Sequence, residues 1–403
     1  MMDVKEIYDA KERLKGHIKE TPVVYAPNLG EDVYLKVEVL QDTGSFKLRG
    51  AYNKIATLSE EEASKGVVAC SAGNHAQGVA KSATERGIDS IICMPYHAPL
   101  SKVSATKNYG AEVVLVKDSF DDAAAYADKL SKEEGYTFIA PFDDEKVIAG
   151  QGTIGLEILE KLPEVDIIVV PIGGGGLISG IALAAKSINP DIKIIGVQTK
   201  ISPGMYESIK DDRIVTVKGG STIADGIAVK TPGDITFEMT KELVDDIVLV
   251  TEGEISSAIL TLLEKNKIIT EGAAASTVAA LMYKKFNHKG KKVCCVLSGG
   301  NIDVTRVSKV IEKGLYKTNR RMELRVKLND APGELTKLTK LLETEGANIV
   351  QIGQHIDVVS DTIDSMIVNI VVDTKNIDHQ NALITMLNEN FYVFKVKYNN
   401  PQF

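Results

Sequence analysis

The sequence contains no apolar run long enough to span a bilayer. Its first residues, Met1-Met2-Asp3-Val4-Lys5-Glu6, mix charges of both signs, which is typical of a helix start and not of a signal peptide. Positive charge is not in excess either, because 47 basic residues face 55 acidic ones and leave a formal net charge of -8. These absences argue against membrane and nucleic-acid partners.

Cysteine and histidine are scarce, and neither is grouped as a metal site or a disulfide framework requires. The four cysteines are Cys70, Cys93, Cys294 and Cys295, and no two of them form a C-x-x-C pair. The six histidines include no H-E-x-x-H arrangement. We therefore predict reduced core thiols in a cytoplasmic protein, and no structural or catalytic metal.

With 403 residues the chain is too long for one ordinary core, so two or three domains are expected. Short apolar segments alternate with helical patterns, which predicts α/β lobes built on parallel sheets. The predicted strands are 33–40, 67–70, 90–94, 112–116, 166–170, 193–198, 247–250 and 293–297. The predicted helices are 3–20, 50–58, 74–86, 101–109, 121–134, 177–188, 254–265 and 272–286. The pattern breaks at Gly150-Gln151-Gly152-Thr153 and then resumes, so we expect two lobes with one sheet each.

The C-terminal part has a different pattern, and a polar, charged linker at 316–321 precedes it. Strands are predicted at 322–328, 348–358, 365–372 and 391–396. Leucines at helical spacing predict one helix that ends at Gly346, and a second helix is predicted at 379–390. The order β-α-β-β-α-β is the ferredoxin-like α+β arrangement.

One lysine lies in the stretch Thr43-Gly44-Ser45-Phe46-Lys47-Leu48-Arg49-Gly50-Ala51, just after a predicted strand. A lone lysine is usually a solvated surface charge. Two later stretches give this one a different interpretation, because they supply a phosphate cradle and a hydroxyl. An amine, a phosphate cradle and a hydroxyl are the groups a protein needs to hold pyridoxal phosphate.

The cradle is Pro171-Ile172-Gly173-Gly174-Gly175-Gly176-Leu177, between a predicted buried strand and a helix. Glycines let the backbone approach a ligand, and the helix N-terminus adds partial positive charge, which together favour a phosphate. A Walker loop needs lysine and then serine or threonine where this sequence has Leu177 and Ile178. The sequence also lacks the third glycine of a Rossmann fingerprint. The alternative is a tight turn without a ligand, but four glycines lower stability and a turn does not need them.

Two further loops follow predicted strands. Ser298 could donate to a pyridine nitrogen, although a serine in this place is often only a turn former. Amides of Ser71-Ala72-Gly73-Asn74-His75-Ala76-Gln77-Gly78 could bind a substrate carboxylate, and Asn74 could reach a ring hydroxyl. An ordinary helix cap explains the second loop equally well.

Five motifs in this order resemble the fold-type II pyridoxal-phosphate enzymes, in the branch of threonine ammonia-lyases (threonine dehydratases) and serine racemases. They are the lysine stretch, Ser71 to Gly78, Gly173 to Leu177, Thr222-Ile223-Ala224-Asp225-Gly226-Ile227-Ala228, and Ser298-Gly299-Gly300-Asn301. The resemblance implies a two-lobed catalytic domain at 1–315, with a small lobe of about 50–145 inserted in the large one. Residues 322–403 resemble an ACT-type regulatory domain.

The resemblance also implies the roles of individual residues. Lys47 forms the Schiff base and removes the α-proton, Phe46 packs beside the ring, and Asn74 contacts its hydroxyl. The phosphate is bound by Gly173, Gly174, Gly175, Gly176 and Leu177, and Ser298 meets the pyridine nitrogen. The substrate carboxylate is held by Ser71, Ala72, Gly73, Asn74 and His75. An amino-acid effector is expected at Asn329, Asp330, Ala331, Pro332 and Gly333.

The implied activity is elimination of water from L-threonine, giving 2-oxobutanoate and ammonia, and pyruvate from L-serine. The resemblance implies that the enzyme serves isoleucine synthesis or threonine breakdown. It also implies a homo-oligomer, either a dimer or a tetramer. Ala72 replaces a second serine of the racemases, so we expect little racemisation. Gln198 replaces a frequent glutamate, so no metal is assigned. The alternatives are a serine dehydratase or serine racemase, and a non-catalytic amino-acid sensor that binds pyridoxal phosphate.

Overall fold

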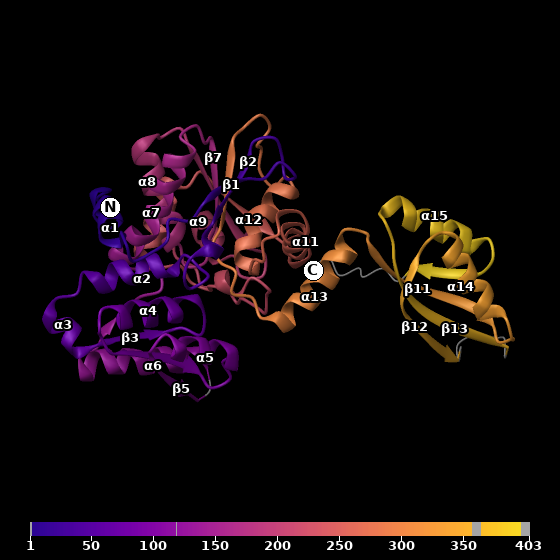
Figure 1. Cartoon of the computed structure of the whole chain (residues 1–403), viewed down its shortest axis with the longest axis horizontal. Helices are drawn as coiled ribbons and strands as arrows, with labels where there is room; N and C mark the ends of the chain where they lie inside the picture. Colours follow the sequence, from indigo (N-terminus) through magenta and orange to yellow (C-terminus); the bar gives the residue numbers. More distant parts are fainter. Residues whose placement is uncertain (1, 118, 357–363, 396–403) are drawn as a thin grey trace. The chain divides into compact units, whose positions relative to one another are not determined.

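The computed structural model describes residues 2–117, 119–356 and 364–395. The chain divides into two units, Met1–Val307 and Ser308–Phe403, and the division falls within helix α13 (Val304–Lys317). None of the helices in the described ranges combines the length and apolarity that a bilayer crossing requires. Figure 1 shows the elements of both units coloured along the chain.

The larger sheet of the first unit has six strands in the order β1-β2-β10-β7-β8-β9, and only β1 is antiparallel to its neighbour. The strands are β1 (Val23–Tyr25), β2 (Val33–Val37), β7 (Ile167–Pro171), β8 (Lys193–Thr199), β9 (Asp246–Val250) and β10 (Val293–Leu297). Every residue of β7 and β10 is buried, which is why these strands are continuous apolar runs.

Helices and helical turns surround this sheet. They are α1 (Lys5–Leu14), η1 (Glu38–Leu40), α2 (Lys47–Ala56), α7 (Glu145–Lys161), α8 (Gly176–Ile188), α9 (Gly204–Lys210), η3 (Asp225–Ile227), α10 (Asp234–Leu243), α11 (Glu252–Thr261), η4 (Leu262–Asn266) and α12 (Gly272–Met282). Residues of α7 and α8 form one apolar core with residues of β7 and β10.

The smaller sheet is fully parallel, in the order β5-β4-β3-β6. Its strands are β3 (Val67–Cys70), β4 (Ser90–Pro95), β5 (Glu112–Val116) and β6 (Thr137–Phe138). Its helices are α3 (Glu60–Lys65), α4 (Asn74–Glu85), α5 (Leu100–Asn108), α6 (Phe120–Lys129) and the turn η2 (Leu130–Glu134). The prediction of α/β lobes on parallel sheets is therefore confirmed, while the two short edge strands β1 and β6 were not predicted.

The break predicted at residues 150–153 is wrong, because these residues lie inside the 17-residue helix α7. A Cβ on Gly150 would lie 2.6 Å from the carbonyl oxygen of Arg49, and one on Gly152 would lie 2.9 Å from that of Gly180. The glycines thus let α7 pack directly against the backbones of α2 and α8. Burial of the helix outweighs a propensity loss of about 1 kcal/mol per glycine.

In the second unit the elements follow the order β-α-β-β-α-β. They are β11 (Arg321–Asn329), α14 (Glu334–Thr344), β12 (Asn348–Ile356), β13 (Ser365–Asp373), α15 (Ile377–Asn388) and β14 (Tyr392–Lys395), and the antiparallel sheet has the order β12-β13-β11-β14. Alternate residues of β11 are buried against leucines of α14 and α15, so both helices cover one face. Residues 357, 358 and 396 of the predicted strands lie outside the described residues. The predicted linker 316–321 contains the end of α13 and the first residue of β11.

Candidate active site

Lys47 is the first residue of α2, so the helix predicted from residue 50 begins three residues earlier. Its ammonium group donates a hydrogen bond to the carbonyl oxygen of Pro141. Burial lowers the pKa of Lys47 to about 8, and the carboxyl group of Glu271 opposes this shift. A lysine in such surroundings is partly a free amine near neutral pH, which is the form that acts as a nucleophile or base.

The lysine turn and the loop that contains Ser298 are joined into one unit. The N–H of Phe46 donates to the carbonyl oxygen of Ser298 at 3.0 Å, and Asn301 Nδ2 donates to the carbonyl oxygen of Thr43 at 2.8 Å. Because β2 and β10 are parallel neighbours, their carboxyl ends lie at the same edge of the sheet. The structure therefore brings Lys47 and Ser298 together, although 250 positions separate them in the sequence.

Two serine residues of this unit are buried. Ser298 is 1% exposed and Ser45 is fully buried. The hydroxyl oxygen of Ser45 has no hydrogen-bond partner among the described residues. Since buried polar groups are nearly always hydrogen-bonded, an unpaired hydroxyl two residues before Lys47 indicates a site for a polar ligand.

The glycine run connects β7 to the N-terminus of α8. Gly175 has φ +103°, and a Cβ there would lie 2.7 Å from the side chain of Thr236. The Thr236 hydroxyl donates to the carbonyl oxygen of Gly174 at 2.6 Å, which holds the run in place. The first N–H groups of α8, at Gly176 and Leu177, have no acceptor within the helix, and both residues are buried. Such a buried helix start fits an anionic group.

The loop at residues 71–75 leads from β3 into α4, which begins at Asn74. Residues 71–74 are partly accessible. A Cβ on Gly78 would lie 3.2 Å from the backbone carbonyl of Lys47, so α4 packs tightly against the start of α2. This contact fixes the first turns of α4 against the backbone of Lys47.

His75 has a different environment from the rest of this loop. Its imidazole is buried and its Nε2 lies 2.8 Å from the carbonyl oxygen of Ile139. Burial, and after it the charge of Lys47, lower the pKa of His75 to about 3. The ring is therefore neutral near pH 7, and its Nδ1 has no hydrogen-bond partner among the described residues.

Sequence reasoning missed Glu271, which lies just before α12 and is 5% exposed. Both carboxylate oxygens accept hydrogen bonds from Asn74 Nδ2, at 2.9 and 3.0 Å. Burial raises the pKa of this carboxyl to about 7. The sequence did contain one signal for Glu271, because it is an acidic residue directly before a helix, α12, that carries no charge. Nothing in the local sequence, however, indicates that Glu271 contacts Asn74.

Gln198, where the sequence departs from a metal-binding pattern, joins two parts of the backbone. Its Nε2 donates to the carbonyl oxygen of Ile172 at 3.3 Å, and its Oε1 accepts from the N–H of Tyr206 at 2.8 Å. No cluster of histidine, cysteine or acidic residues suitable for a metal ion occurs in the described ranges.

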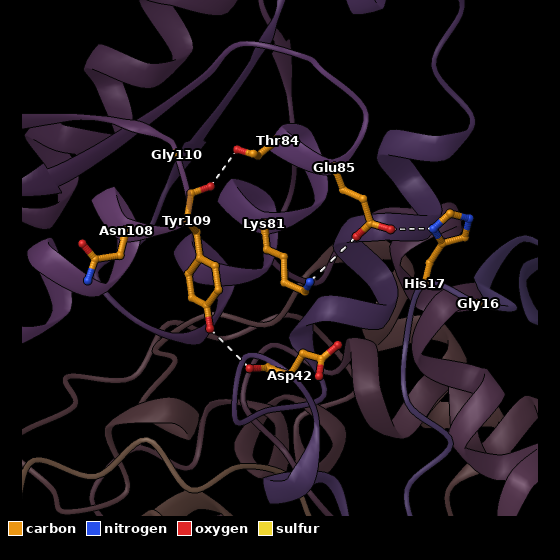
Figure 2. A pocket seen from close by; sticks show the side chains of 9 residues that line it. All are labelled: Gly16, His17, Asp42, Lys81, Thr84, Glu85, Asn108, Tyr109 and Gly110. Atoms are coloured by element: carbon orange, nitrogen blue, oxygen red, sulfur yellow. Dashed lines mark hydrogen bonds and ion pairs between the residues drawn. The ribbon is translucent and has the colours of Figure 1, made fainter.

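Figure 2 shows a separate hollow lined by Gly16, His17, Asp42, Lys81, Thr84, Glu85, Asn108, Tyr109 and Gly110. Its charged side chains have partners: Glu85 lies 2.6 Å from His17 and 3.9 Å from Lys81, and Asp42 pairs with Lys19, outside the lining, at 2.5 Å. The Tyr109 hydroxyl donates to the carbonyl oxygen of Asp42 at 3.3 Å. None of these residues is a predicted site residue, and the paired charges leave little to recognise a ligand, so we place the active site at Lys47.

The residues around Lys47 fit pyridoxal phosphate. An amine with a lowered pKa would hold the aldehyde, the buried start of α8 would hold the phosphate, and the hydroxyl of the buried Ser298 would face the ring nitrogen. The turn at Asn329–Gly333 belongs to the second unit, where it joins β11 to α14 and is exposed.

Comparison with known proteins gives a consistent result. The family described as "Pyridoxal-phosphate dependent enzyme" matches residues 14–299. An L-threonine ammonia-lyase of Thermotoga maritima is 51% identical over 87% of this chain and 88% of its own length. An L-threonine ammonia-lyase of Geobacter sulfurreducens is 45% identical over 96% of this chain and 97% of its own length. The solved structure of maize serine racemase has 37% identity and a TM-score of 0.74, covering 78% of this chain and 98% of that one.

Proposed function

Because the chain belongs to the family of pyridoxal-phosphate dependent enzymes, we propose that it is a threonine ammonia-lyase that converts L-threonine to 2-oxobutanoate and ammonia. Its cofactor is pyridoxal phosphate, and its reaction class is that of a carbon–nitrogen lyase. The observation that carries the proposal is the convergence of Lys47, the buried start of α8 and the buried Ser298 at one edge of the large sheet. L-Serine, which would give pyruvate, is the expected second substrate.

Each residue has a defined task in this proposal. Lys47 holds the aldehyde, and Phe46 packs beside the ring. Asn74 contacts the ring hydroxyl, and Ser298 donates to the ring nitrogen. The phosphate is held by Gly173, Gly174, Gly175, Gly176 and Leu177, and the substrate carboxylate by backbone groups of Ser71, Ala72, Gly73, Asn74 and His75.

Pyridoxal phosphate, when bound, withdraws electrons from the α-carbon of an amino acid and makes its proton acidic. The free amine of Lys47 then takes that proton at Nζ, because a pKa near 8 leaves part of the amine unprotonated at neutral pH. The β-hydroxyl would take up a proton and leave as water, and hydrolysis of the released enamine would give 2-oxobutanoate and ammonia. A neutral Ser298 hydroxyl, rather than a carboxylate, makes the ring a weaker electron sink, which favours this loss over transamination.

Racemisation needs a proton donor on the opposite face of the α-carbon. Ala72 lies where serine racemases carry a serine, and its methyl group has no proton to give. We therefore expect elimination to dominate, with little D-serine formed from L-serine.

The test is a coupled assay for 2-oxoacids with the purified protein, pyridoxal phosphate and either L-threonine or L-serine, with chiral analysis of the remaining serine. We expect 2-oxobutanoate from threonine and no accumulation of D-serine. Rapid D-serine formation would support a serine racemase instead. If the protein binds the cofactor but forms no 2-oxoacid from either substrate, a non-catalytic amino-acid sensor is the better description.

We further propose that the second unit is an ACT-type regulatory domain that binds an amino-acid effector at Asn329, Asp330, Ala331, Pro332 and Gly333. The match to the Geobacter sulfurreducens protein extends over 96% of this chain and so includes most of this unit. The turn is exposed and leads into the N-terminus of α14, where backbone N–H groups are available to a carboxylate. Such domains usually pair, so a homo-oligomer (a dimer or tetramer) is expected.

This regulatory role predicts that isoleucine, valine or threonine shifts the activity or the melting temperature of the full chain. A substitution in the turn, Asp330→Lys, should weaken the response because it places a bulky cation in the exposed loop, and it should leave basal turnover unchanged. The assay is turnover and thermal denaturation with each amino acid in turn. If none of the three changes either quantity, the unit serves only for association between chains.

A further inference from the structure

The carboxyl group of Glu271 lies between loops that come from distant parts of the sequence. Its backbone N–H donates to the carbonyl oxygen of Gly299 at 3.1 Å, which joins the start of α12 to the loop after β10. A Cβ on Gly299 would lie 2.7 Å from Glu271 Oε1, and one on Gly226 would lie 3.5 Å from the same oxygen. Gly299 therefore leaves room for this carboxyl group, whereas a Cβ on residue 226 would only touch it.

The hydrogen bonds of Glu271 determine the orientation of the Asn74 amide. Asn74 Nδ2 donates to both oxygens of Glu271, and Asn74 Oδ1 accepts from Asn301 Nδ2 at 2.8 Å. An ionised carboxylate is only an acceptor, so the NH₂ group of Asn74 must face it. Asn301 in turn donates to the carbonyl oxygen of Thr43, four residues before the lysine. A continuous set of hydrogen bonds thus links Glu271 to the lysine turn.

We propose that Glu271 is a positioning residue of this active site, which orients Asn74 and holds the loop at residues 71–75 against the loop that contains Ser298. Glu271 acts through Asn74, so the loss of its carboxylate disturbs the alignment of substrate and cofactor without removing the groups that hold them. The inference deepens the proposed function and rests on it where turnover is the measurement.

Protonation is expected to weaken this contact. A proton on one carboxyl oxygen makes it a donor and leaves a single good acceptor for Asn74 Nδ2. The charged groups that influence Glu271 are Asp225 on η3, Lys102 on α5 and Lys47 on α2. Burial raises the pKa of Glu271, and the hydrogen bond from Asn74 lowers it. Burial has the larger effect, so the pKa is about 7 and the carboxyl group titrates near neutral pH.

The decisive variant is Glu271→Gln, since glutamine has the same size but presents one acceptor and one donor to Asn74. In the protein loaded with pyridoxal phosphate, we expect kcat/KM for L-threonine to fall by about 10- to 100-fold, as for small misplacements of reacting groups. The bound cofactor should remain visible by its absorption. The inflection near pH 7 in the pH profile of kcat/KM should also disappear, because the titrating group is gone.

A double variant tests whether Glu271 acts through Asn74. If it does, Asn74→Ala combined with Glu271→Gln is no slower than Asn74→Ala alone, whereas independent roles give multiplied losses and overturn the inference. The matched control is Glu254→Gln on α11, which is also a buried glutamate but pairs with Lys285 at 2.8 Å. This control should leave the turnover and its pH profile unchanged.

A spectroscopic readout separates this inference from the proposed function. The absorption of bound pyridoxal phosphate is titrated with pH in the wild type and in Glu271→Gln, with no substrate present. A transition near pH 7 that is lost in the variant supports the inference, whether or not the protein turns over L-threonine. An absence of turnover would refute only the proposed function. Identical titrations, or wild-type kcat/KM in the variant, overturn it. If Glu271→Gln does not fold, Glu271→Asp should retain the transition and lose kcat/KM.

Discussion

Lys47→Met is expected to lower the turnover of L-threonine by about 10³-fold or more, because it removes both the covalent anchor and the base. The protein should nevertheless fold, since among the described residues the Lys47 ammonium has only a backbone carbonyl, that of Pro141, as its hydrogen-bond partner. Lys47→Arg should be as inactive, because a guanidinium group does not lose its proton in this pH range. The measurement is 2-oxobutanoate formation, together with the visible absorption of the cofactor.

The matched control is Lys54→Met, seven residues further along the same helix, where the half-buried side chain pairs with Asp144 at 2.8 Å. It should bind the cofactor and turn over threonine at close to the wild-type rate. An active Lys47→Arg variant, or a wild-type protein that acquires no colour with pyridoxal phosphate, would contradict the assignment of Lys47.

The same substitution has a pH signature in the cofactor-free protein. The folded-state pKa of Lys47 is about 8 against an ordinary value of 10.5, so between these values the unfolded chain binds more protons. Stability attributable to Lys47 therefore rises with pH from about 8 to about 10.5, and below about pH 8 the buried ammonium destabilises the fold. In Lys47→Met this rise should be absent, and denaturation midpoints measured across the range provide the check.

Arg49→Met is expected to lower the free energy of unfolding by about 3–5 kcal/mol, the usual effect of removing one partner from a buried ion pair. Arg49 is fully buried. Its guanidinium donates to both oxygens of Glu38 at 2.8 and 2.9 Å, and to both oxygens of Glu157 at 2.5 and 2.8 Å. The buried Lys36 pairs with the same glutamates, so the cluster is neutral and the substitution leaves one negative charge uncompensated.

Two further variants make this prediction specific. Arg49→Met combined with Glu157→Gln restores neutrality and should be more stable than Arg49→Met alone. Arg213→Met, at an arginine whose side chain is 74% exposed, should change stability by no more than about 0.5 kcal/mol. Urea denaturation of all the variants without cofactor supplies the comparison. An Arg49→Met midpoint equal to the wild type would mean that the cluster does not stabilise the fold.

The local sequence was sufficient to predict the strands that carry the site. The apolar runs of β7 and β10 predict buried parallel strands because each is short, wholly apolar and soon followed by a glycine run or by a serine and glycines. The glycine run is also recognisable locally, since its function depends on backbone N–H groups at one helix start. By contrast, the glycines of α7 suggested a break, because only the neighbouring helices α2 and α8 explain why small residues are needed there.

The sequence by itself determined which chemical groups this protein possesses: an amine in a short turn, a run of glycines before a helix, and a hydroxyl after a buried strand. Only the tertiary structure decided which of them meet. Asn74 and Glu271 are 197 positions apart and lie within 3.0 Å because two lobes and the loop after β10 converge there. Burial then lowers the pKa of Lys47 and raises that of Glu271. Strand order and burial are properties of the packed chain, so no local pattern could have shown them.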